Sequence, residues 1–312
     1  MSETAGFSPE SSVGATRLFD GEPFSPSIYN PYMTHDSPAS IAELAAAVPD
    51  GAKLAIPNEN CGIAMAATRE LVRRGARNLH LVTVPVAGLQ ADILIGAGCV
   101  SVIETSGVTL GEYGTGPRFA AAVREGRVRV LDATCPAIYA ALQAGEKGIP
   151  FMPLRGLLGT DVLKNRREWT VIDNPFRAIG VGEDPIVLLP AIRPDTALFH
   201  APLADRQGNV FVGRKRELLT MAHAARQTLV TVEEIGEAGL FDDPALAAGV
   251  VPAIYVTRIA LARRGAWPLA LTDRYGTDEQ MLARYAELAR TEQGFADFLH
   301  EWLASDPVAL AA

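Results

Sequence analysis

The chain has 312 residues, of which 48% are hydrophobic, enough for one large α/β domain or two smaller ones. Its 28 Lys and Arg residues against 36 Asp and Glu residues give a net charge of −8. This balance argues against non-specific binding to nucleic acid or to an anionic membrane, because no overall positive field attracts phosphate.

The three cysteines predict a protein of the reducing cytoplasm. Cys61, Cys99 and Cys135 fit neither a CxxC metal motif nor a disulfide framework. No signal-peptide pattern and no apolar run of about 18 residues is seen, so we expect no leader and no membrane span.

The first half of the chain has the pattern of alternating strands and helices. Residues 1–37, rich in Ser, Pro, Gly and Thr, are expected to form a weakly ordered arm, and residues 38–312 one domain that opens with Ser37 as a helix N-cap. The predicted strands are 53–57, 78–84, 99–104, 128–133 and 149–153. The predicted helices are 62–75, 89–98, 117–126 and 136–148. This alternation predicts an α/β fold with a mostly parallel, doubly wound sheet and helices on both faces.

The second half is less regular. Its predicted strands are 170–173, 186–191, 196–201, 209–212 and 228–235, with a helix over 216–226. After residue 236 the pattern becomes mostly helical, with helices predicted over 278–290 and 294–304. We therefore expect a helical C-terminal segment.

Polar residues follow several predicted strands, which indicates a site at one edge of the sheet. In a doubly wound sheet, ligands bind outside the carboxyl ends of the strands. The residues in question are Asn58, Glu59 and Asn60, then Glu104, then Arg155, Gly156, Gly159, Thr160 and Asp161, and finally His200, Asp205 and Asn209. Walker, GxSxG and HExxH motifs are absent, and the five scattered histidines predict no metal site.

Five stretches resemble the α (A) subunit of class I coenzyme A transferases, of the glutaconate CoA-transferase type. They are LQADILIGAG, VIETSGVTLGEYGTGPRFAAAVREG, IPFMPLRGLLGTDVL, HAPLADRQGNV and RYGTDEQMLARYAELARTEQGF. The resemblance implies an enzyme that moves CoA between an acyl-CoA and a carboxylic acid, with CoA as a substrate and no permanently bound cofactor. It also implies a homologous B subunit that supplies the glutamyl nucleophile, in a heterotetramer.

The resemblance also implies roles for residues in the matched stretches. The loop from Arg155 to Asp161 is expected to face the partner and the acyl group, with Gly156 and Gly159 permitting close backbone approach. Glu104 is expected at the site edge, where it positions or activates the substrate or a water. In HAPLADRQGNV, Asp205 and Asn209 are expected to serve turn geometry rather than chemistry.

The turn after the first strand departs from the family pattern. In place of a glycine-rich turn whose amides help to form the oxyanion hole, it reads Pro57-Asn58-Glu59-Asn60-Cys61-Gly62. Proline has no amide donor, so the side chains of Asn58 and Asn60 are the substitute donors. Three interpretations of Glu59 stay open: a catalytic base or nucleophile, a substrate-orienting residue paired with Arg155, or part of a solvated turn.

Two other functions stay open besides CoA transfer. One is ring-opening or thioester hydrolysis of an acyl-CoA on the same fold. The other is a non-catalytic subunit that shapes the site of its partner.

Overall fold

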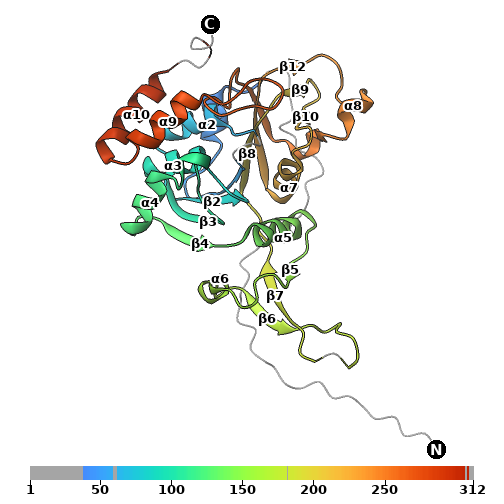
Figure 1. The fold of residues 1–312 in the computed structure, drawn as a ribbon. Helices are drawn as coiled ribbons and strands as arrows, with labels where there is room; N and C mark the ends of the chain where they lie inside the picture. The colour runs from blue at the N-terminus through green and yellow to red at the C-terminus, as the bar shows by residue number, and fades with distance from the viewer. Residues whose placement is uncertain (1–37, 59–61, 181, 306–307, 309–312) are drawn as a thin grey trace, which may run out of the picture.

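A parallel seven-stranded sheet forms the centre of the molecule (Figure 1). The computed structural model describes residues 38–58, 62–180, 182–305 and 308, so the expected arm over 1–37 lies outside the described residues. The strand order is β14-β11-β8-β1-β2-β3-β4, with every neighbouring pair parallel. The strands are β1 (Lys53–Pro57), β2 (Leu79–Val84), β3 (Val100–Thr105), β4 (Arg129–Asp132), β8 (Thr196–Ala201), β11 (Gln227–Val232) and β14 (Arg258–Leu261).

Helices cover both faces of this sheet, which confirms the predicted fold class. One face packs against α1 (Ile41–Ala46), α2 (Met65–Arg73), α3 (Leu89–Gly96) and α4 (Pro117–Arg124), and the other against α5 (Cys135–Glu146) and α7 (Arg216–Ala224). Successive side chains of a strand point to opposite faces. In β1, Leu54 and Ile56 therefore belong to the first core and Ala55 to the second.

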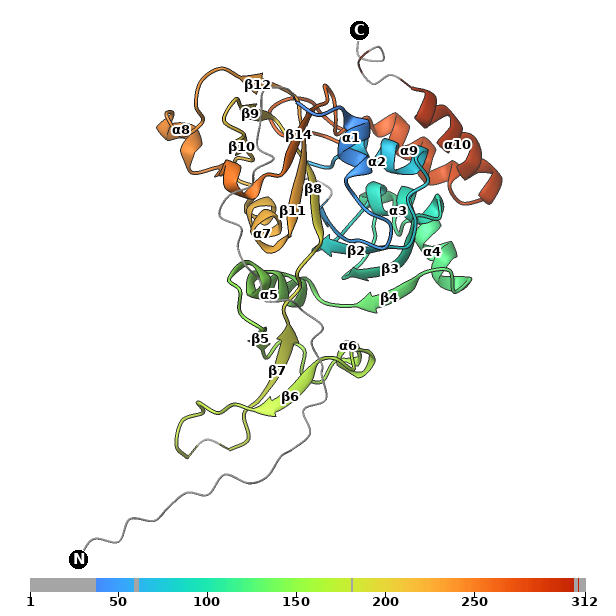
Figure 2. The same cartoon turned by 180° about the vertical axis from the view of Figure 1, so that it is seen from behind.

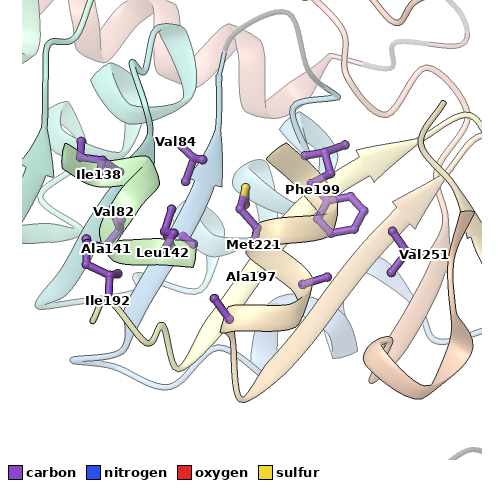
Figure 3. Packing of buried hydrophobic residues seen from close by; sticks show 14 of the residues in the cluster. Val82, Val84, Ile138, Ala141, Leu142, Ile192, Ala197, Phe199, Met221 and Val251 are labelled. Carbon is purple, nitrogen blue, oxygen red and sulfur yellow. The ribbon is translucent and has the colours of Figure 1, made fainter. Parts of the chain in front are cut away.

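Figure 3 shows the second core from close by. Leu142 of α5 and Met221 of α7 point toward the sheet, where they meet side chains such as Val82 and Phe199. All four are fully buried. This packing fixes α5 and α7 against the sheet face formed by β1, β2 and β8.

The first helix begins later than the sequence indicated. Ser37 lies outside the described residues, and the N-cap of α1 is Ser40. Its side chain accepts a hydrogen bond from the amide of Glu43, whose carboxylate accepts one from the amide of Ser40. This capping box satisfies two helix-end amides at once, which is why the helix starts there.

Three predicted strands belong to a second sheet rather than to the main one. The segments 149–153, 170–173 and 186–191 form the antiparallel sheet β5-β7-β6, which projects away from the body (Figures 1 and 2). Its strands are β5 (Phe151–Leu154), β6 (Thr170–Asp173) and β7 (Pro185–Pro190), with α6 (Asp161–Asn165) between β5 and β6. Unlike the strands at the centre of the main sheet, β5 is partly open to solvent, with Phe151 44% exposed.

A third, four-stranded sheet has the order β12-β9-β10-β13. The predicted strand 228–235 divides between β11 and this sheet. Its strands are β9 (Leu203–Asp205), β10 (Val210–Phe211), β12 (Ile235–Gly236) and β13 (Val250–Val251). The remaining short helices are η1 (Gly111–Tyr113), α8 (Pro244–Ala247) and η2 (Ala253–Tyr255).

The helical C-terminal segment is confirmed. It consists of α9 (Glu279–Leu288) and α10 (Glu292–Ala304), which share a core with residues at the starts of α2 and α3. Within it, Tyr285 Oη donates to Asp92 Oδ2 at 2.6 Å, and burial raises the pKa of both groups. Within the described part of the chain, no helix is both long and apolar enough to cross a membrane.

Candidate active site

The candidate site follows the edge at which the parallel strands end. β1 ends before Asn58, and its neighbour β8 carries His200 at its second-to-last position. On the other side, β2 separates β1 from β3, which carries Glu104. Because neighbouring strands are about 4.8 Å apart, the ends of β1 and β3 are roughly 10 Å apart. The edge thus holds two clusters, one around Glu104 and one around His200.

Glu104 lies in a buried ion pair instead of standing open at the edge. It is 4% exposed, and its Oε1 atom accepts a hydrogen bond from Arg166 Nη2 at 2.5 Å. Arg166 also donates to the carbonyl of Asp132 at 2.9 Å and to Glu168 Oε1 at 2.5 Å. Its guanidinium lies 4.1 Å from the centre of the Trp169 ring. The expectation of an edge-facing carboxylate is wrong, because Glu104 points to the sheet face that the segment after α6 covers.

His80 is the other basic side chain near Glu104. The distance from His80 Nε2 to Glu104 Oε2 is 3.9 Å, and among the described residues this nitrogen finds no hydrogen-bond partner. Burial, followed by the charges of Lys53, Arg129 and Arg166, lowers the pKa of His80 to about 4. His80 is therefore neutral near pH 7, and Arg166 is the cation that pairs with Glu104.

The polar side chains of the loop from Arg155 to Asp161 pair with residues outside the Glu104 cluster. The loop is linked to that cluster only in sequence, because it leads through α6 to Arg166. Arg155 pairs with Asp184 of the projecting sheet, with Nη2–Oδ2 at 2.6 Å and Nε–Oδ1 at 3.0 Å. Its expected pairing with Glu59 lies outside the described residues and stays a prediction. Asp161 pairs with Lys164 at the exposed surface, and Thr160 donates to the carbonyl of Leu157.

Neither glycine of this loop meets another part of the chain closely. A Cβ atom added at Gly156 or Gly159 would have no described atom within 4 Å, and the expected close approach to the partner and the acyl group stays a prediction. Gly159 has φ of +78°, a conformation that favours glycine. The loop is anchored by the fully buried Leu157, and it leads into α6 and from there to Arg166.

The turn after β1 is attached to β8 at Gly62. Glu59, Asn60 and Cys61 lie outside the described residues, whereas Asn58 and Gly62 lie within them. The carbonyl of Gly62 accepts a hydrogen bond from the amide of His200 at 2.7 Å. Gly62 has φ of +75°, and a Cβ atom there would lie 2.0 Å from the carbonyl oxygen of His200.

Gly62→Ala should therefore displace this turn and destabilise the protein. The added methyl group meets backbone, which cannot rotate away, and alanine disfavours a positive φ. We expect a loss of about 2 kcal/mol or more in the free energy of unfolding, measured by urea denaturation. Gly51→Ala is the matched control, because Gly51 has a similar φ of +79° with open space around it. Equal losses in the two variants would contradict the steric argument.

A buried network centred on Glu233 holds His200 in place, and no motif in the sequence indicates it directly. His200 is fully buried, with Nδ1 at 2.8 Å from Thr231 Oγ1 and Nε2 at 2.8 Å from Glu233 Oε1. Tyr275 Oη donates to Glu233 at 2.7 Å, and the amides of Arg264 and Gly265 donate at 2.7 and 3.0 Å. Glu233 directly follows β11, the strand beside β8, but it lies inside the strand predicted over 228–235, so the sequence did not mark it as a strand-end residue.

These donors determine the charge state of Glu233. Burial alone would raise its pKa, but the hydrogen bonds from His200 and Tyr275 outweigh burial and lower the pKa to about 2. The pKa of Tyr275 is raised by burial and by the neighbouring carboxylate. Glu233 is thus an ionised carboxylate that accepts several hydrogen bonds and holds the donors in place. Its low pKa makes it a weak base.

A pocket of about 810 Å³ opens beside Gly62 and His200. Its other walls come from the stretch between β10 and α7, from α8 and from residues 271–273. Asp205 and Asn209 take no part in the lining. They form a buried turn in which Asp205 Oδ1 accepts from the amides of Gln207 and Asn209, as expected. Among the described residues, no group of three or more His, Cys, Asp and Glu side chains is placed to hold a metal ion.

The chain belongs to the coenzyme A transferase family, whose model matches residues 39–262. It is 30% identical to the A subunit of 3-oxoadipate CoA-transferase from Pseudomonas knackmussii, over 82% of this chain and 89% of that one. It is also 30% identical to the cholesterol ring-cleaving hydrolase IpdA subunit of Mycobacterium tuberculosis, over 77% of this chain and 83% of that one. A match to an uncharacterised protein of Archaeoglobus fulgidus, at 28% identity, spans 75% of this chain and only 51% of that protein.

The structural comparison agrees with the sequence comparison. The crystal structure of glutaconate coenzyme A-transferase from Acidaminococcus fermentans superposes with a TM-score of 0.77 at 26% identity, covering 85% of this chain and 88% of that one. The predicted resemblance to the A subunits of this family is confirmed. Within the family, this chain is similar to the A subunits of 3-oxoadipate and glutaconate CoA-transferases.

Proposed function

We propose that this chain is the A subunit of a cytoplasmic two-component enzyme that moves CoA between an acyl-CoA and a carboxylic acid. A homologous B subunit completes the enzyme, in a heterotetramer, and supplies the glutamate that attacks the substrate. One observation supports a nucleophile on the partner: the carboxylates of Glu104 and Glu233, at the ends of the parallel strands, already have partners within this chain. Glu104 is paired with Arg166, and Glu233 accepts four hydrogen bonds.

The chemistry follows from a nucleophile on the partner. The partner's glutamate attacks the thioester carbon, the C–S bond breaks, and a mixed anhydride and the CoA thiolate form. The thiolate attacks the glutamyl carbonyl of the anhydride and releases the donor acid, leaving a glutamyl-CoA thioester. The acceptor carboxylate attacks this thioester, and the same steps in reverse give the new acyl-CoA and restore the glutamate.

The role of this chain is to bind the substrate and to polarise the carbonyl group that is attacked. Each carbonyl attack develops an oxyanion, and donors placed beforehand stabilise it. We assign Asn58 and Asn60 as side-chain donors, because Pro57 has no amide hydrogen to offer. The hydrogen bond from His200 to Gly62 supports this assignment, since it fixes the end of the turn that carries both asparagines.

Product analysis tests this proposal. The purified complex with its partner is incubated in H₂¹⁸O with an acyl-CoA and an excess of an acceptor acid. We expect acceptor-CoA to form in equal amount to the released donor acid, which carries no ¹⁸O. Free CoA together with ¹⁸O in the released acid would overturn CoA transfer and indicate hydrolysis.

Hydrolysis is the second candidate, favoured by Glu104 and by the similarity to the IpdA subunit. A buried carboxylate near the substrate could orient or activate a water once the substrate competes for Arg166. Hydrolysis then predicts a loss of maximal rate in Glu104→Gln. A rise in KM with the maximal rate kept would restrict Glu104 to binding. If the chain only shaped the site of its partner, no polar substitution here would change the rate.

A further inference from the structure

The pocket beside Gly62 has a basic wall. Arg214 and Lys215 lie between β10 and α7, Arg216 is the first residue of α7, and all three line the pocket. Its volume of about 810 Å³ is within the range of small-molecule sites. Gly62 and His200 form another part of the lining, so a ligand bound here reaches the turn after β1.

The three cations are not neutralised within the described part of the chain. No acidic side chain there forms an ion pair with Arg214, Lys215 or Arg216, although the protein has a net charge of −8. Two acids, Glu217 and Asp273, also line the pocket and leave its lining positive overall. Three consecutive like charges repel one another, and an anionic ligand would relieve that repulsion.

Apolar side chains line the same pocket. Phe211, Val212, Leu218 and Leu271 belong to its walls, and Val212 and Leu218 are buried. A ligand that fits has an apolar body and an anionic end. Arginine pairs with carboxylate and phosphate through two parallel hydrogen bonds, which sets the direction of such a ligand.

We propose that this pocket binds the anionic end of a substrate on Arg214, Lys215 and Arg216, with its chain extending toward Gly62. The proposal rests on the proposed function, because an acyl-CoA enzyme handles two kinds of anion. One is a second carboxylate on the acyl group or acceptor acid, and the other is a phosphate of CoA. Both present the same chemistry to the pocket.

Calorimetric titration of the complex with its partner tests the proposal without turnover. The probes are glutarate and butyrate, which differ in a second carboxylate, and CoA and dephospho-CoA, which differ in one phosphate. The variant R214A/K215A/R216A removes the basic wall. The control R124A/R193A/R290A removes equal charge at exposed positions outside the pocket. The single variant R216Q serves if the triple variant does not fold, as judged by its unfolding midpoint.

We expect the pocket variant to bind either glutarate or CoA at least about tenfold more weakly, while the control variant binds both as the wild type does. Loss of glutarate binding with butyrate unchanged identifies a carboxylate site. Loss for CoA but not for dephospho-CoA identifies a phosphate site. Unchanged binding of both glutarate and CoA, or equal weakening in the control variant, overturns the proposed anion site. If binding falls as expected but the complex transfers no CoA, the proposed function fails while the anion site stands.

Discussion

Arg166→Ala is expected to destabilise the protein by about 3–5 kcal/mol, because it leaves the buried Glu104 carboxylate without its cation. Glu104 is 4% exposed and Arg166 is 4% exposed, so water does not replace the lost partner. The variant also removes the donor to the Asp132 carbonyl and the contact with the Trp169 ring. Urea unfolding of the wild type and the variant, in complex with the partner, measures the loss.

A double variant separates the charge effect from lost packing. In Glu104→Gln/Arg166→Met both charges are absent, so no unpaired ion stays buried. We expect it to recover most of the stability that Arg166→Ala loses. If the double variant is as unstable as Arg166→Ala, the ion pair is not the reason that this segment is held to β3.

Glu233→Ala is the second substitution with a large expected effect, a loss of about 2–4 kcal/mol. It removes the acceptor of His200 Nε2, Tyr275 Oη and two backbone amides, which then lie buried and unpaired. We expect activity of the complex to fall as well, because His200 both lines the pocket and holds Gly62. Tyr275→Phe removes only one of these hydrogen bonds, so it should cost about 1 kcal/mol.

The pH dependence gives an independent check on Glu233. Its folded pKa of about 2 lies below the ordinary value of 4.5. The resulting stabilisation is fully present above about pH 4.5 and is lost as the pH falls toward 2. The difference in unfolding free energy between wild type and Glu233→Gln should therefore shrink over this range. A difference that stays constant from pH 6 to pH 3 would contradict the charged, hydrogen-bonded state.

The main sheet could be predicted because its strands are short, apolar and separated by helices. The segments 53–57, 78–84, 99–104, 128–133 and 196–201 all lie in it. The projecting sheet could not be assigned, because a local pattern does not say which strands pair. β5, for example, pairs with β7 about 35 residues later and not with the sheet it follows. β14 was not predicted, because its four residues, two exposed and two buried, show no alternation of apolar and polar residues that marks a strand.

The candidate site was predicted in position but not in its contacts. In the structure Asn58, Glu104 and His200 lie at the carboxyl ends of parallel strands, as predicted, although the carboxylate of Glu104 points to a sheet face and not to the open edge. The partners of these residues are distant in sequence: Arg166 is 62 positions from Glu104, and Glu233 is 33 from His200. Only the packing of the segment after α6 and the pairing of β8 with β11 bring them together. Glu59 keeps its three interpretations, because residues 59–61 are not described.

The most direct test locates the nucleophile. The complex is incubated with an acyl-CoA, reduced with borohydride to trap any glutamyl-CoA thioester, and digested for peptide mass analysis. We expect a reduced glutamate in a peptide of the B subunit, with none in this chain. A reduced glutamate at position 59 or 104 of this chain would contradict the central claim that the partner supplies the nucleophile.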